Sequence, residues 1–155
     1  MLLSSFLLLQ GCPVAPEDTG DTGGAEVGRL GLSFEIDSDQ QDRMDEDPVG
    51  VFTGSFYLAT DVTTLGPNEG AVPVGAILVE EVDLRAGATE VLFTSDDLPA
   101  EAIVVLGFLD SDDNRDPLDA DPDNKDPVTL PGQNTFLVEA DSTSEARVHF
   151  GFLNP

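Results

Sequence analysis

The segment RLGLSFEID, residues 29–37, decides the fold class because apolar and polar residues alternate along it. Leu30, Leu32, Phe34 and Ile36 fall on one side of an extended chain, with small or polar residues between them. Alternation with a period of two is the pattern of a β-strand with one buried and one solvent-facing side. This segment therefore predicts the first strand of a β-sheet.

Six further segments carry strand patterns. The segment VFTGSFYLATDV, residues 51–62, repeats the alternation, whereas AIVVLGFL, residues 102–109, is apolar throughout, as is typical of a central strand. The pair Glu80-Glu81 interrupts the alternation of residues 74–84 and predicts a β-bulge there. The remaining strands are expected at residues 90–95, 135–140 and 146–153.

Seven short strands without a helical stripe longer than two turns are typical of an all-β fold. We predict a single seven-stranded antiparallel β-sandwich of immunoglobulin-like or transthyretin-like kind. The run VLFTSDDLPAEAIVVLGFLDSDDN, residues 91–114, resembles the stretch of bacterial transthyretin-like sandwich domains in which a Leu-Pro turn between two strands precedes an Asp/Asn-rich loop. Leu98 and Pro99 match that turn, while Glu101 stands where Gly is common. The resemblance implies the architecture and leaves the activity open.

The net charge of the chain limits the classes of partner that it can bind. Among 155 residues, 31 acidic residues against 6 basic ones give a formal net charge of -25. Such a surface repels nucleic acid and anionic lipid, so we expect no nucleic-acid partner and favour cations or basic proteins. The length leaves room for one domain with a core, and 9 Phe residues argue against a wholly disordered chain.

The N-terminal residues have the pattern of a secretion signal. Residues 1–9, MLLSSFLLL, form an uncharged apolar run that ends at LQGC, residues 9–12. This ending resembles the lipobox of bacterial lipoproteins, because Leu9 lies three positions before the cysteine and Gly11 directly before it, although Gln10 is an unusual residue there. The resemblance implies a bacterial lipoprotein of the cell envelope, anchored to a membrane through lipidated Cys12.

Three regions follow from this interpretation: a signal peptide at 1–11, the lipidated cysteine with a flexible acidic linker at 12–28, and the sandwich domain at 29–155. The linker contains Asp-Thr-Gly twice, at 18–20 and 21–23, which is the motif around the catalytic carboxylates of aspartic proteases. Those carboxylates come from two separate loops and share a proton. Two motifs on one polar segment do not supply that arrangement, so we expect a tether and no protease.

The acidic run DSDDNRDPLDADPDNKDP, residues 110–127, is the strongest chemical signal in the domain. Oxygen-bearing side chains recur at every second position at its start, and Ca²⁺ takes about six to eight oxygen ligands. Arg115 stands where an EF-hand loop has Gly, so the match is to calcium chemistry and not to the EF-hand fold. A solvated acidic loop is the alternative interpretation. The predicted ligands are Asp110, Asp112, Asn114, Asp116, Asp119, Asp121, Asp123 and Asp126.

A second acidic run, IDSDQQDRMDEDP at residues 36–48, follows the first strand. If consecutive strands are antiparallel, the two acidic loops leave the sandwich at the same end. Asp37, Asp39 and Asp45 are candidates for another ion, although a solvated loop is the favoured interpretation.

His149 is the only histidine. It alternates with Val148, Phe150 and Phe152, which are expected to face the core, so we expect His149 to be exposed. No Ser or Cys nucleophile is evidently paired with it.

Together these patterns predict a non-enzymatic, lipid-anchored sandwich that calcium stabilises and that serves as a structural or binding module. Its partners are the membrane and a basic or envelope protein. Two alternatives stay open: an envelope hydrolase that uses paired carboxylates of the acidic loops, and a carrier that holds a small apolar ligand between the sheets.

Overall fold

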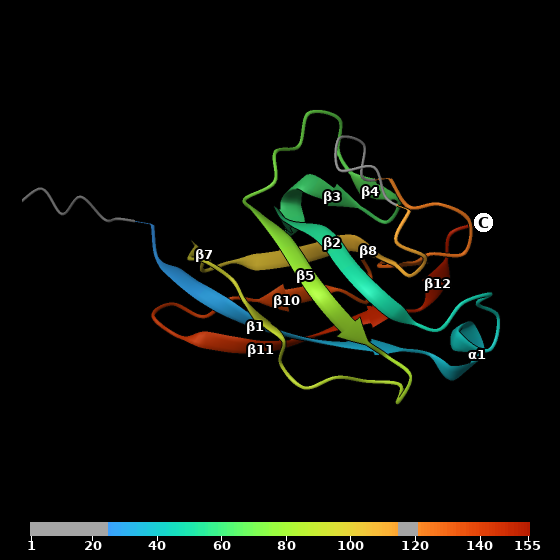
Figure 1. The fold of residues 1–155 in the computed structure, drawn as a ribbon. Helices are drawn as coiled ribbons and strands as arrows, with labels where there is room; N and C mark the ends of the chain where they lie inside the picture. Colours follow the sequence, from blue (N-terminus) through green and yellow to red (C-terminus); the bar gives the residue numbers. More distant parts are fainter. Residues whose placement is uncertain (1–24, 115–120) are drawn as a thin grey trace, which may run out of the picture.

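Two β-sheets pack face to face in the part of the chain that the computed structural model describes, residues 25–114 and 121–155 (Figure 1). The first sheet has the order β11-β1-β6, with β7 also paired to β1, and the second has the order β12-β9-β8-β2-β5, with β10 paired to β8. The predicted all-β sandwich is therefore confirmed. The only helical segments in the described residues are the four-residue α1 and the three-residue 3₁₀ turn η1.

The elements have the following bounds: β1 (Val27–Ile36), α1 (Ser38–Gln41), β2 (Val49–Leu58), η1 (Ala59–Asp61), β3 (Val62–Thr63), β4 (Gly66–Pro67), β5 (Gly75–Asp83), β6 (Phe93–Thr94), β7 (Leu98–Pro99), β8 (Ala102–Asp110), β9 (Pro127–Val128), β10 (Thr135–Leu137), β11 (Thr143–Phe150) and β12 (Phe152–Leu153). Each of the seven predicted strands has a counterpart among them. Strand β1 begins at Val27, inside the predicted linker.

One strand pair departs from the antiparallel prediction. Strands β1 and β11 are parallel, from Arg29 opposite Thr143 to Ile36 opposite Phe150, whereas all other described pairs are antiparallel. Parallel neighbours need a long connection, and here that connection includes every strand of the second sheet except β12.

The predicted bulge at Glu80 and Glu81 is confirmed. Gly50 pairs with Val82 and Phe52 with Val79, so Val51 alone lies opposite the two glutamates. One extra residue in β5 is the definition of a β-bulge, and it disturbs this edge of the second sheet.

The core lies where the alternation of the first segment predicted it. Leu30, Leu32 and Phe34 are fully buried. The ring of Phe34 lies 4.9 Å from that of Phe52, which belongs to the opposite sheet. It lies 6.3 Å from that of Phe150, on the neighbouring strand β11, so all three rings belong to one cluster. Aromatic pairs at such distances stabilise a core beyond the burial of their area.

The prediction that Phe152 faces the core is wrong, since 43% of it is exposed. The strand is interrupted at Gly151, between β11 and β12, and the alternation shifts so that Leu153 faces inward. A side chain at Gly151 would come within 2.7 Å of Gln133 Oε1, so the Gln133 side chain would have to move to make room for it.

Asn134 is a fully buried polar residue that the sequence patterns did not reveal. Its Oδ1 accepts a hydrogen bond of 2.7 Å from the His149 N–H, and its Nδ2 donates to the carbonyl groups of His149 and Leu130, both at 3.0 Å. The side-chain amide thus takes the place of a neighbouring strand at the end of β11.

We expect Asn134→Ala to lower the free energy of unfolding by about 2–4 kcal/mol, because it leaves one buried N–H and two carbonyl groups without this partner. Chemical denaturation of the full chain measures the loss. The exposed Asn124→Ala is the matched control, with an expected change within about 0.5 kcal/mol. An equally small change for Asn134→Ala would contradict the assignment.

Candidate functional site

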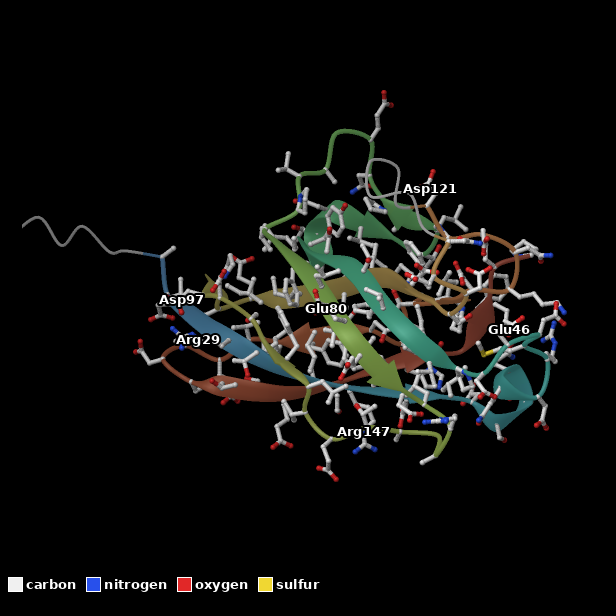
Figure 2. All side chains as sticks on the ribbon, viewed as in Figure 1. Arg29, Glu46, Glu80, Asp97, Asp121 and Arg147 are labelled. Atoms are coloured by element: carbon white, nitrogen blue, oxygen red, sulfur yellow. The ribbon has the colours of Figure 1, made fainter. Side chains whose placement is uncertain are left out.

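The two acidic loops leave the sandwich at the same end, as predicted. Lys125 of the second loop donates from Nζ to Asp45 Oδ1 of the first at 2.7 Å. Figure 2 shows Glu46 and Asp121 at this end and Arg29 with Asp97 at the other. We call the described residues 37–48, 110–114 and 121–126 the acidic end. Both loops line a small surface pocket there of about 140 Å³.

Two carboxylates at the base of the acidic end are buried. Asp110, the last residue of β8, is 1% exposed, and Asp126, directly before β9, is 3% exposed. The backbone of Asp110 lies beside β2, opposite Val51, and Gly50 permits this close approach: a Cβ at that position would be 1.9 Å from the Asp110 carbonyl oxygen. Both buried carboxylates thus lie at the ends of strands of the second sheet.

Asn114 joins the two arms of the loop above these carboxylates. Its Nδ2 donates to Asp112 Oδ2 at 2.7 Å and to Asp123 Oδ2 at 2.5 Å. Its backbone N–H donates to Asp110 Oδ1 at 3.2 Å, and the Asp123 N–H donates to Asp126 Oδ2 at 3.1 Å. Five predicted ligands are thereby connected through hydrogen bonds along the two arms.

Of the other three predicted ligands, only Asp121 is among the described residues. Asp121 is exposed, and Asp116 and Asp119 lie outside the described residues. Within residues 25–114 and 121–155, no group of three or more His, Cys, Asp or Glu side chains is arranged to hold a metal ion. Asn114 here offers its N–H groups to the carboxylates, whereas a cation needs its carbonyl oxygen, so coordination requires the amide to turn.

The environment of Asp126 disfavours its charged form. Burial raises the pKa of this carboxyl to about 6, and the negative charges of Asp123 and Asp110 add to the increase. Hydrogen bonds from the backbone N–H groups of Asp123 and Ser111 act in the opposite direction but do not cancel it. At neutral pH the acidic end therefore holds a buried charge that costs stability unless a cation offsets it.

This raised pKa predicts how stability changes with pH in metal-free protein. Because the folded state holds the Asp126 proton more tightly than the unfolded state, Asp126 destabilises the fold as pH rises from about 4 to 6. Relative to Asp126→Asn, the wild type should lose at most about 3 kcal/mol between pH 4 and 7, equivalent to the pKa increase of about two units. Denaturation of both proteins with a chelator present measures the difference, and a pH-independent difference would contradict the burial argument.

The loop after β1 uses its carboxylates differently. Asp37 Oδ1 lies 2.9 Å from His149 Nε2, Asp45 contacts Lys125, and Asp39 accepts a 3.2 Å hydrogen bond from Gln40. All three candidate ligands in this loop therefore contact side chains of the protein. No described contact brings the three together, which agrees with the solvated-loop interpretation.

The prediction that His149 is exposed is wrong. Only 15% of its side chain is accessible, and its Nδ1 is buried without a hydrogen-bond partner among the described residues. Alternation placed it correctly on the side of β11 away from the core, but Asp37 and the segment around Gln133 and Gly151 cover that side. Such cover comes from parts of the chain distant in sequence, so no local pattern predicts it.

Lys125 was also missed as a structural residue, although a lone basic residue in an acidic run is a signal for it. Lys125 has φ 71, a backbone conformation unusual for a residue with a side chain, and its N–H donates to the Asn154 carbonyl at 2.7 Å. It therefore ties the second acidic loop to the first loop and to the C-terminal segment.

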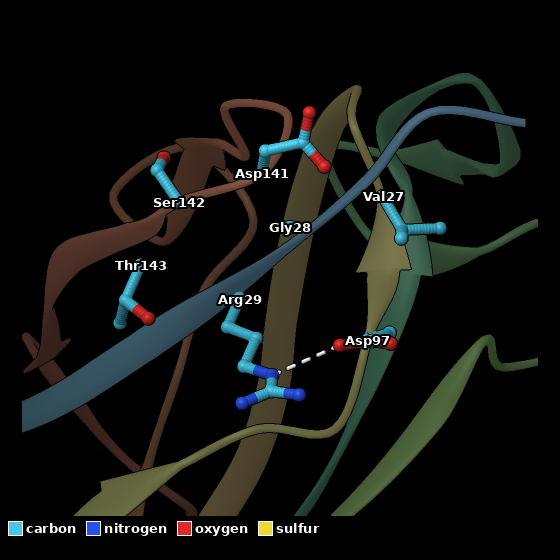
Figure 3. Close-up of a pocket in the computed structure, with 7 residues that line it drawn as sticks. All are labelled: Val27, Gly28, Arg29, Asp97, Asp141, Ser142 and Thr143. Atoms are coloured by element: carbon cyan, nitrogen blue, oxygen red, sulfur yellow. Dashed lines mark hydrogen bonds and ion pairs between the residues drawn. The ribbon is translucent and has the colours of Figure 1, made fainter.

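A pocket of about 330 Å³ lies at the opposite end of the sandwich (Figure 3). Arg29 and Asp97 line it and form an ion pair of 2.9 Å. This pocket, like four others formed by described residues, opens at the surface between loops and strand ends. None of the five is lined by the core side chains between the sheets, so the carrier alternative gains no support from them.

No helix in the described residues is long and apolar enough to cross a membrane. Comparison of the chain with protein-family models, with curated proteins and with solved structures gives no significant match.

Proposed function

We propose that this chain is a calcium-stabilised β-sandwich, held on a bacterial envelope membrane by a lipid on Cys12, that serves as a structural or binding module. The observation that carries the proposal is the pair of buried carboxylates, Asp110 and Asp126, beneath a loop with further carboxylates. In a chain with a net charge of -25, these groups gain most from a bound cation.

Calcium fits this donor set better than other common cations. The acidic end offers carboxylate and amide oxygens, which hard cations prefer, and its irregular loop suits the variable coordination of Ca²⁺ better than the strict octahedron of Mg²⁺. Asp112, Asp123 and Asn114 are exposed and already adjacent, so a cation can reach them from solvent.

The geometry also supports an orientation for the anchored protein. Strand β1 begins at Val27, at the end of the predicted linker, and ends at Ile36, next to the acidic end (Figure 1). Ten extended residues cover about 33 Å. An anchor at Cys12 would therefore keep the acidic end on the far side of the sandwich from the point of attachment, accessible to a basic partner.

Isothermal titration of the chelator-treated full chain tests the proposal. We expect one saturable Ca²⁺ site with a Kd of about 10⁻⁴–10⁻³ M, and at least about tenfold weaker binding of Mg²⁺. Asp112→Asn with Asp123→Asn should remove the site, because both carboxylates converge on it. Asp39→Asn with Asp42→Asn, which removes the same charge from the other acidic loop, should leave it intact. Heat changes without saturation, or equal responses to the two ions, would rule out a specific site.

A second candidate, a hydrolase with a carboxylate pair, is favoured by one observation. The pKa of Asp126 is raised to about 6 beside another carboxylate, as in many general acids. Against it, Asp126 is 3% exposed and so poorly accessible to a substrate. Hydrolysis of glycoside or ester substrates that disappears in Asp126→Asn would favour this candidate, whereas any activity that survives the substitution would exclude it.

A further inference from the structure

Strand β11 forms the outer edge of the first sheet, and one side of its backbone faces away from β1. The backbone carbonyl groups of Ser142 and Phe150 accept hydrogen bonds from the N–H groups of Arg29 and Asp37. The backbone N–H and carbonyl groups of the even-numbered residues of β11 are therefore directed toward β1. The N–H and carbonyl of His149 instead bond to the Asn134 side chain. The odd-numbered residues of β11 therefore direct their backbone groups outward.

Asn134 closes this edge at His149 but not farther along the strand. No hydrogen bond within the described residues occupies the outward backbone groups of Thr143, Glu145 and Arg147. The edge is regular over the whole of β11, because the register with β1 runs without a shift. Unpaired groups on a regular edge strand are a template for another strand.

The other long edge strand is protected in a way that β11 is not. Strand β5 contains the bulge at Glu80 and Glu81, and Asp83 adds a third acid. A bulge disturbs pairing, and like charges directly opposite each other are unfavourable in a sheet. The exposed residues of the open part of β11, in contrast, carry one charge of each sign, Glu145 and Arg147.

We infer that the open edge of β11 pairs with the same edge of a second copy of this chain, antiparallel about a two-fold axis at Ala146. In that register Glu145 of each copy lies opposite Arg147 of the other, and the outward N–H and carbonyl groups of these residues pair as an antiparallel ladder does. The charge pattern of this edge is therefore self-complementary between two copies of the chain.

Arg147 is available for this contact. Its side chain is 62% exposed and lies 3.5 Å from Glu35 of the same chain. A guanidinium has about five N–H donors in a planar fork and can contact two carboxylates. Glu145 is exposed and has no ion pair among the described residues. The edge pairing supplies its partner.

Sedimentation equilibrium of the full chain in mild detergent, at about 150 mM NaCl to shorten the repulsion between the acidic chains to about 8 Å, tests the inference. The wild type should show a reversible monomer–dimer equilibrium. Glu145→Arg and Arg147→Glu should each raise the dimer Kd at least about tenfold, because each places like charges opposite each other at two symmetric positions. A mixture of the two variants, and the double variant with both changes, should restore dimerisation.

Glu80→Arg on β5 is the matched control. It changes the net charge by the same amount as Glu145→Arg does. If only the general repulsion between the chains mattered, both variants would associate more strongly than the wild type. If the β11 edges pair, Glu145→Arg should associate more weakly and Glu80→Arg should not. Circular dichroism checks that the variants are folded. A wild type that stays monomeric at every concentration, or a dimer unaffected by the charge exchanges, would overturn the inference, since association through the apolar residues 1–9 would not respond to them.

Discussion

Addition of about 10 mM Ca²⁺ to the metal-free full chain should raise its melting temperature by about 10 °C. Calcium modules outside the cell bind at about 10⁻⁴–10⁻³ M, so this concentration is about 100-fold above the tighter value and stabilises by about 2.7 kcal/mol. The physical source is the relief of repulsion around the buried carboxyl of Asp126, whose pKa is raised to about 6 by burial and by the neighbouring carboxylates.

The control separates a specific site from screening, because any salt stabilises a chain with a net charge of -25. MgCl₂ at the same concentration has the same ionic strength and the same charge, so screening predicts equal shifts for the two ions. We expect only the common part of the shift in Asp112→Asn with Asp123→Asn, and the full shift in Asp39→Asn with Asp42→Asn. Equal shifts for both ions in all three proteins would mean that the acidic end is a solvated surface.

Replacement of Cys12 by Ser should release the protein from the membrane fraction almost completely. The membrane attachment proposed here depends on the lipid at Cys12, and a serine at this position cannot carry the thioether-linked lipid. The fold should not change, since the described strands begin at Val27 and the described core cluster extends from Leu30 to Phe150.

Fractionation of cells, with circular dichroism of the released protein, measures both parts of this expectation. Asp18→Asn with Asp21→Asn is the matched control on the same segment, because it alters the repeated Asp-Thr-Gly motif without altering the cysteine. This control should stay in the membrane fraction. Membrane association of the Cys12→Ser variant would contradict the anchor, and loss of its fold would contradict the division into linker and domain.

Local patterns predicted the strands but only part of their pairing. Alternation along residues 29–37 identified the buried side of β1, and the double glutamate in β5 identified the bulge. The parallel pairing of β1 with β11 was not predictable in this way, since it depends on how the chain crosses from β10 in the second sheet to β11 in the first. A strand pattern states which side is buried and says nothing about which strand lies beside it.

The candidate site was also predictable only in part. Acid spacing identified the loop after β8, but it did not predict that Asp110 and Asp126 are buried, because burial depends on parts of the chain that are distant in sequence, such as β2 beside Asp110. His149 was misjudged for the same physical reason. Alternation predicted its position on the strand correctly, whereas Asp37 and the segment around Gln133 shield its side chain from solvent.

The most direct test of the cation site is an X-ray structure of the full chain grown with CaCl₂ and compared with one grown with a chelator. We expect an anomalous density peak at the acidic end with about six to eight oxygen ligands at about 2.3–2.6 Å, including carboxylates of Asp112 and Asp123 and the turned amide oxygen of Asn114. An ordered loop without such a peak, in which Asn114 still donates to both carboxylates in the presence of calcium, would contradict the proposed function.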